Sequence, residues 1–423
     1  MDEKKHGKTA LVLAGGGLTG AVYEIGALRA IDDLLVDRTV NDFDIYVGTS
    51  AGALVTSLLA NGVSPEEMLR VIDGTHPEAA LLDRQHIFGI NRYDILTWGL
   101  RLPSKFLAAW YNYIRHINDM TLFDLIWSMA EALPPGLYDG LALENYLQRA
   151  LADLGKSNRF DELARDLYII ATDLDSGERV VFSQGENEEV PISLAVAASA
   201  ALPLLYKPVR IEGKEYVDGG LRGTASLDLA IERGATMVVC INPLVPFDNN
   251  HNASRAFLGT GGAYLSEKGI PAIANQSIRI LSHSGLHYHI KQLRRTHPEV
   301  DIILIEPRPE DYQMFFYNIM HYSSRLIVAR HGFESVTMDL AVDYAYYKQV
   351  LGRHGIPLSR RLVIEEMAKI VESDYDPEVI RSVLEARSEG CGQRNRDTPV
   401  CKLNRALAEL ELALEALQFE EVS

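Results

Sequence analysis

The chain has 423 residues, of which 47% are apolar and 23% are charged, a balance typical of a globular protein with a large core. Its formal net charge of −17 argues against a nucleic-acid-binding protein, because such proteins neutralise phosphates with basic side chains. The same charge argues against broad electrostatic adhesion to anionic lipid surfaces.

Residues 8–62 alternate between short apolar strands and helices. A strand is predicted over 8–13 and a helix over 20–35, followed by a second strand over 42–48 and a second helix over 52–60. The first helix carries apolar residues three or four positions apart on one face: Val22, Ile25, Leu28, Ile31 and Leu35. Two successive strand–helix units predict a parallel sheet that is covered by helices.

Residues 86–138 contain all three tryptophans of the chain, Trp98, Trp110 and Trp127, together with many Phe and Tyr residues. This composition indicates a helical insertion. Its aromatic side chains could pack a core of their own. They could also form an apolar cap over an active site that dips into a lipid surface, where Trp and Tyr are favourable. The two interpretations are compatible.

Two hairpins are predicted further along the chain, over 166–183 and 209–220. A helix of small residues lies between them and ends before Pro203, and a buried strand follows over 235–241. Beyond residue 245 the pattern predicts mostly polar loops and helices.

The C-terminal region carries two recognisable patterns. One more strand is predicted within the sequence VDIILIEP. In the C-terminal tail, leucines recur four and three positions apart in an a/d heptad stripe, at Leu403, Leu407, Leu410, Leu414 and Leu417. Such a stripe either docks on its own domain or forms a homo-oligomer.

Gly48-Thr49-Ser50-Ala51-Gly52 lies between the second predicted strand and the second helix. A G-x-S-x-G sequence at such a turn is the nucleophile elbow of serine hydrolases, with glycines where the backbone leaves no room for a Cβ atom. The motif also occurs by chance, so Ser50 becomes a candidate nucleophile only in the context of its neighbours.

The first predicted strand is followed by GGGLTG, in which Gly15, Gly17 and Gly20 also satisfy G-x-G-x-x-G. A dinucleotide site would need an acidic residue at the end of the second strand to bind the ribose. That strand ends instead at the Ser50 motif. Backbone N–H groups of Gly15, Gly16 and Gly17 could form an oxyanion hole, because loops after neighbouring parallel strands lie at the same edge of a sheet.

A nucleophilic serine needs a base. The elbow comes after only two strands, too early for an α/β-hydrolase with a Ser-Asp-His order. His283, His287 and His289 lie close together, and a pair at i and i+4 could bind a metal on a helix. Because no carboxylate follows at a suitable spacing, we interpret them as a polar helix face and expect no metal and no cofactor.

Three motifs, GGGLTG, GTSAG and the DGG at Asp218, occur in the order and spacing of the patatin-like phospholipases, which the sequence resembles over roughly residues 8–245. The resemblance implies Ser50 as nucleophile and Asp218 as base in a Ser–Asp dyad without histidine. It also implies the amides of Gly15, Gly16 and Gly17 as the oxyanion hole. The remaining motif glycines are Gly20, Gly48, Gly52, Gly219 and Gly220.

The resemblance further implies an α/β fold of three layers, a mostly parallel central sheet flanked by helices, with the helical insertion and a helical C-terminal region. We expect a catalytic domain over 1–245, a mostly helical extension with one strand over 246–390, and a linker with an amphipathic helix over 391–423.

The expected function is hydrolysis of lipid acyl esters, with peripheral membrane contact and no nucleic-acid partner. Thr19 stands where the family often carries Arg or Lys, which favours neutral glycerolipids or other acyl esters. Together with the heptad tail, it also motivates an alternative, a non-catalytic lipid-binding or scaffold protein.

The cysteine content predicts the compartment. Cys240, Cys391 and Cys401 form an odd, sparse set, typical of a reducing environment, although Cys391 and Cys401 could pair if oxidised. No segment approaches the ~20 apolar residues of a membrane span, and the N-terminal residues lack a signal-peptide pattern. We therefore expect a cytoplasmic protein.

Overall fold

The structure is a computed structural model, and it describes most of the chain. The residues described are 7–77, 89, 106–108, 110–116, 121, 134–249, 264–309, 314, 322–385 and 406. Most of the aromatic insertion lies outside the described residues, as do the heptad leucines, Cys391 and Cys401.

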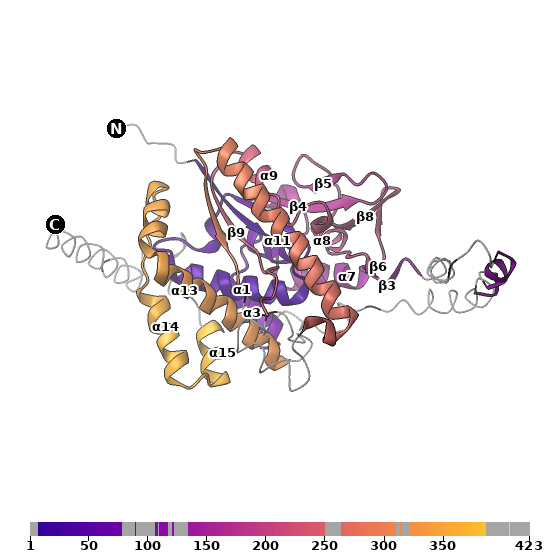
Figure 1. Ribbon diagram of the computed structural model, residues 1–423. Helices are drawn as coiled ribbons and strands as arrows, with labels where there is room; N and C mark the ends of the chain where they lie inside the picture. The colour runs from indigo at the N-terminus through magenta and orange to yellow at the C-terminus, as the bar shows by residue number, and fades with distance from the viewer. Residues whose placement is uncertain are drawn as a thin grey trace.

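An eight-stranded sheet forms the centre of the described chain (Figure 1). Its strands are β1 (Lys8–Leu13), β2 (Ile45–Thr49), β4 (Asp166–Asp173), β5 (Arg179–Phe182), β7 (Val209–Ile211), β8 (Lys214–Asp218), β9 (Ala235–Ile241) and β10 (Asp301–Ile305). Strands β10, β9, β1, β2 and β4 are parallel neighbours in that order. Strands β5 and β8 both pair antiparallel with β4, and β7 pairs antiparallel with β8. A separate parallel pair is formed by β3 (Gly136–Tyr138) and β6 (Leu204–Tyr206).

Helices cover both faces of this sheet. The described α-helices are α1 (Gly17–Leu34), α2 (Ala51–Ala60), α3 (Pro65–Asp73), α7 (Leu141–Asp153), α8 (Ile192–Ser199), α9 (Leu227–Glu232), α11 (Ile270–Thr296), α13 (Tyr322–Arg353), α14 (Arg361–Glu372) and α15 (Pro377–Glu385). Short 3-10 helices are η1 (Val40–Asp42), η2 (Phe160–Glu162), η3 (Gly219–Leu221) and η4 (Leu265–Lys268).

Alternation along the strands divides the core into two layers. Leu11 and Leu13 of β1 pack with α1, α2, α8 and α13, whereas Ala10 and Val12 face α9 and α11. Successive side chains of a strand point to opposite faces, so a sheet that is apolar on both faces must be covered twice. The predicted α/β fold with a mostly parallel, helix-flanked sheet is confirmed, and so are both hairpins.

The chain beyond residue 245 contributes to this same core. Strand β10 pairs with β9 in the central sheet, and α13 packs along α1. The two helix backbones touch: a Cβ atom at Gly26 would lie 1.9 Å from the Ala329 carbonyl oxygen, and one at Gly332 would lie 2.1 Å from the Tyr23 carbonyl oxygen. Two glycines, one on each helix, therefore allow the close approach.

A cluster of charged side chains is buried at the outer side of α1. The Arg29 cluster comprises Arg29, Asp33, Glu66 and Glu366, and the arginine side chain is fully buried. Its guanidinium pairs with Asp33, lies 3.7 Å from Glu66 and 3.1 Å from Glu366, and donates to the Val383 carbonyl oxygen. These contacts join α1 to α3, α14 and α15.

Candidate active site

Ser50 lies at the sharp turn between β2 and α2. Strand β2 ends at Thr49 and α2 begins at Ala51, so Ser50 caps the helix N-terminus with φ 56° and ψ −121°. A positive φ is strained for a residue with a side chain, and this conformation is the one that a nucleophile elbow requires.

The glycines beside Ser50 allow the turn to pass close to its neighbours. A Cβ atom at Gly52 would lie 2.5 Å from the Leu13 carbonyl oxygen at the end of β1. One at Gly48 would lie 2.1 Å from the Thr56 hydroxyl oxygen of the following helix. Neither position has room for a side chain, which is why the turn contains glycine on both sides of the serine.

Asp218 is the last residue of β8, and its carboxylate reaches the Ser50 hydroxyl. Ser50 Oγ donates to Asp218 Oδ2 at 2.6 Å, and the Gly220 N–H donates to Asp218 Oδ1 at 2.7 Å. The Asp218 backbone is also fixed, because its N–H donates to the Ala201 carbonyl oxygen and its carbonyl accepts from Thr172 Oγ1. A carboxylate held at both oxygens and along its backbone has a defined orientation toward the hydroxyl.

Both side chains of this pair are nearly inaccessible to solvent, with Ser50 8% and Asp218 5% exposed. Burial raises the pKa of the Asp218 carboxyl to about 6, even though the hydrogen bonds from Ser50 and Gly220 favour its charged form. An ordinary carboxylate is a poor proton acceptor near neutral pH. The Asp218 carboxylate is a stronger base that still ionises below pH 7.

The glycine loop after β1 lies directly against the elbow. A Cβ atom at Gly15 would lie 3.1 Å from Ser50 Cβ and 3.6 Å from Ser50 Oγ. The loop runs into the N-terminus of α1, which begins at Gly17 after Gly16 as its cap. The Ser50 hydroxyl therefore lies at the N-terminus of α2, whose dipole favours negative charge, and beside the loop that leads into α1.

The structure thus brings three distant segments to the carboxyl edge of the sheet: the glycine loop, the elbow and the start of the DGG sequence. Gly219 continues the close packing, because a Cβ atom there would lie 2.3 Å from the Ile170 carbonyl oxygen. Gly20 packs against Pro243, with a Cβ position 2.9 Å from its ring.

Residues 11–231, just over half of the chain, match the sequence profile of the patatin-like phospholipases. The chain belongs to the patatin-like phospholipase family.

Sequence relatives of this patatin-like chain include proteins of viruses and of an animal. It is 26% identical over 212 residues to an uncharacterised protein of Acanthamoeba polyphaga mimivirus, covering 50% of this chain and 57% of that one. It is 22% identical over 232 residues to a probable lipid hydrolase of Invertebrate iridescent virus 6. That alignment covers 54% of this chain and 64% of the viral protein. It is 28% identical over 249 residues to an intracellular phospholipase A2 of Caenorhabditis elegans. That alignment covers 55% of this chain and 18% of the nematode protein. The chain therefore spans less than two thirds of the length of these relatives.

Among solved structures, the crystal structure of VipD from Legionella pneumophila is similar to this one. The alignment covers 80% of this chain and 67% of the VipD chain. The sequence identity is 14% and the TM-score is 0.36.

One polar residue of the patatin-like site was not singled out from the sequence. Ser199, at the end of α8, is fully buried; its Oγ accepts the Ser50 backbone N–H at 2.8 Å and donates to the Ile170 carbonyl oxygen at 2.6 Å. It therefore ties the strained elbow to the neighbouring strand β4. Its signal in the sequence is its place near the end of the helix of small residues that was predicted before Pro203.

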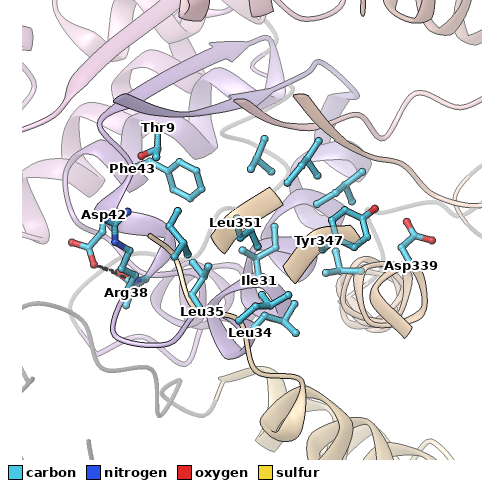
Figure 2. Close-up of a pocket in the computed structure, with 17 residues that line it drawn as sticks. Thr9, Ile31, Leu34, Leu35, Arg38, Asp42, Phe43, Asp339, Tyr347 and Leu351 are labelled. Atoms are coloured by element: carbon cyan, nitrogen blue, oxygen red, sulfur yellow. Dashed lines mark hydrogen bonds between the residues drawn. The ribbon is translucent and has the colours of Figure 1, made fainter. Parts of the chain in front are cut away.

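An apolar pocket elsewhere in the patatin-like fold is separate from this site. It lies between α1, α13 and the sheet, and Figure 2 shows it lined by side chains such as Ile31, Leu34 and Tyr347. It shares no lining residue with the glycine loop or the Ser50–Asp218 pair. Its volume of about 50 Å³ is a third of the roughly 150 Å³ cavity that holds one benzene molecule, so it has no room for a lipid acyl chain.

In the described part of the chain, none of the helices combines the length and the apolar character that crossing a bilayer requires.

Proposed function

We propose that the protein hydrolyses acyl esters of lipids with Ser50 as nucleophile and Asp218 as general base. The observation that carries the proposal is the 2.6 Å hydrogen bond from a strained elbow serine to a buried carboxylate, in a chain of the patatin-like phospholipase family. A hydroxyl that donates directly to a carboxylate can lose its proton without an intervening imidazole.

In the first half of the proposed reaction, Ser50 Oγ attacks the ester carbonyl carbon while its proton moves to Asp218 Oδ2. The tetrahedral intermediate then expels the alcohol, which takes the proton from Asp218. In the second half, Asp218 accepts a proton from water as the water attacks the acyl-enzyme. Collapse of that intermediate returns the proton to Ser50 Oγ and releases the fatty acid.

Negative charge on the carbonyl oxygen would be stabilised by the glycine loop. The 3.1 Å separation between a Gly15 Cβ position and Ser50 Cβ puts the loop backbone within reach of an ester bound at Ser50. Backbone N–H groups at the start of α1 add the favourable end of a helix dipole. Such preorganised donors usually make the largest single contribution to acyl-transfer catalysis.

The surroundings of the pair favour an apolar substrate. Leu204 and Leu205 of β6 are 84% and 40% exposed, and they follow closely on Ala201, whose carbonyl binds the Asp218 backbone. Exposed leucines beside a site suit an acyl chain or peripheral contact with a lipid surface. With Thr19 in the first turn of α1, directly after the glycine loop, we propose neutral glycerolipids or other uncharged acyl esters as preferred substrates.

Covalent labelling tests the proposed nucleophile. A fluorophosphonate probe is expected to add once to the folded protein, on the peptide that contains Ser50, with loss of labelling in Ser50→Ala. Ser57→Ala is the matched control, because Ser57 lies on the same helix and bonds only within it in the structure described. Hydrolysis of a panel of lipid vesicles should follow the labelling. Folded wild-type protein that neither labels nor releases fatty acid would support the non-catalytic lipid-binding alternative.

The pH dependence of kcat/KM is expected to report the base. With the pKa of Asp218 raised to about 6 by burial, activity should rise with pH up to about 6 and level off above it, since only the carboxylate accepts the proton. Below the midpoint the rate should fall about tenfold per pH unit. The measurement uses a water-soluble acyl ester, with circular dichroism at each pH to confirm folding. A rate that stays constant down to about pH 4 would contradict Asp218 as the base.

A further inference from the structure

A second group of chemically active side chains lies on α11, away from the Ser50–Asp218 pair. His283 and His287 are one helical turn apart, and their rings are in contact, with centroids 4.1 Å apart and planes tilted by 42°. Both reach toward Glu306, the first residue after β10. His287 Nε2 lies 2.9 Å and His283 Nε2 lies 3.5 Å from the same oxygen, Glu306 Oε2. One ligand atom from each of the three side chains lies within 4.8 Å of the other two.

These separations suit a shared metal ion. Around a tetrahedral zinc ion with bonds of roughly 2.1 Å to nitrogen and oxygen, ligand atoms are about 3.4 Å apart. The His283–Glu306 separation of 3.5 Å lies close to that value. The His287–Glu306 separation of 2.9 Å is that of a direct hydrogen bond, which would lengthen by about 0.5 Å when an ion takes the place of the proton. Two imidazoles and one carboxylate form a ligand set used by zinc and other first-row divalent ions.

The carboxylate is oriented by a buried neighbour. Asn242, which follows β9 and is fully buried, donates from Nδ2 to Glu306 Oε1 at 2.7 Å. Its own backbone N–H donates to the Ile305 carbonyl oxygen at 2.9 Å, so the amide is fixed by the sheet. Glu306 Oε2 is thereby left facing the histidines, in the way that outer partners orient the ligands of metal sites.

We propose that His283, His287 and Glu306 bind one divalent first-row transition-metal ion, Zn²⁺ in particular, through the imidazole nitrogens and one carboxylate oxygen. Three protein ligands leave a coordination position for water. The three side chains are 27%, 47% and 17% exposed for His283, His287 and Glu306, so solvent has access to the site. The ion would connect α11 to the end of β10 and stabilise the layer that covers this face of the sheet.

Isothermal titration with Zn²⁺ tests the site, using full-length protein without a polyhistidine tag. Binding of one ion per chain is expected, with an affinity at least about tenfold lower in His287→Ala, His283→Ala and Glu306→Gln. His289→Ala is the matched control, because His289 lies on the same helix but faces Asp228. It should bind like wild type. Cobalt substitution adds a spectroscopic readout, because Co²⁺ at three protein ligands gives visible d–d bands that His287→Ala should lose.

Two further variants separate zinc binding at these three residues from ester hydrolysis and from zinc binding by cysteine thiolates. Ser50→Ala should bind zinc as wild type does, so the site can be judged whether or not the protein is a hydrolase. A Cys391→Ser, Cys401→Ser double variant should also retain binding. The proposal is overturned if wild-type protein binds no zinc, if binding is lost with the two cysteines, or if His287→Ala and His289→Ala lower the affinity equally.

Discussion

Asp218→Asn is expected to lower kcat for ester hydrolysis by about 10²- to 10⁴-fold, the usual contribution of a general base. The asparagine oxygen can still accept the Gly220 N–H, so the loop should keep its shape. The amide group, however, would face Ser50 Oγ as a donor and could not take its proton. Stopped-flow or steady-state assays with a soluble ester measure the loss.

The matched control for this variant is Asp175→Asn. Asp175 lies in the exposed turn between β4 and β5, and removing its charge should leave kcat unchanged. Thermal unfolding of both variants should occur close to the wild-type temperature. An Asp218→Asn enzyme that retains more than about a tenth of the wild-type rate would show that another group accepts the proton.

Arg29→Met is expected to lower the free energy of unfolding by about 3–5 kcal/mol, because it leaves buried carboxylates without their cation. Asp33 and Glu66 are almost completely buried, and burial together with Asp33 already raises the pKa of Glu366. Methionine fills a similar volume, so the loss would come from charge and hydrogen bonding rather than from a cavity. Urea denaturation followed by circular dichroism measures it.

An exposed ion pair provides the comparison for the Arg29 cluster. Arg159 pairs with Asp161 at the surface, and its side chain is 63% exposed. Arg159→Met should leave the unfolding midpoint unchanged, because exposed pairs are screened by water and salt. Equal unfolding curves for the Arg29 and Arg159 variants would show that the buried cluster is not stabilising.

The elbow and its partner loops could be predicted because each is specified by a short motif of consecutive residues. Gly48 and Gly52 mark places where a side chain cannot fit, and a β-strand must precede them and a helix must follow. Two successive strand–helix units likewise predicted the parallel sheet, and β-rich runs around turn residues predicted both hairpins. In each case a pattern of a few consecutive residues is sufficient to specify the local backbone.

Features that depend on distant segments were not predictable in this way. Ser199 acts through contacts with Ser50 and Ile170 that only the packing of α8 creates. Glu306 follows His287 by 19 residues, across a helix end and a strand, so its approach to the histidines has no local signature. Arg29 carries a charge, so its residue type alone would place it at the surface.

The close packing of Gly26 against Ala329 and of Gly332 against Tyr23 has an evolutionary consequence. A larger residue at either position would push α1 and α13 apart, and the N-terminus of α1 carries the glycine loop that lies against Ser50. Selection on the chemistry at one end of α1 therefore constrains which residues are tolerated some three hundred positions later in the chain. Each glycine is required by the backbone of the opposite helix, so a side chain at either position alone should be enough to disturb this packing.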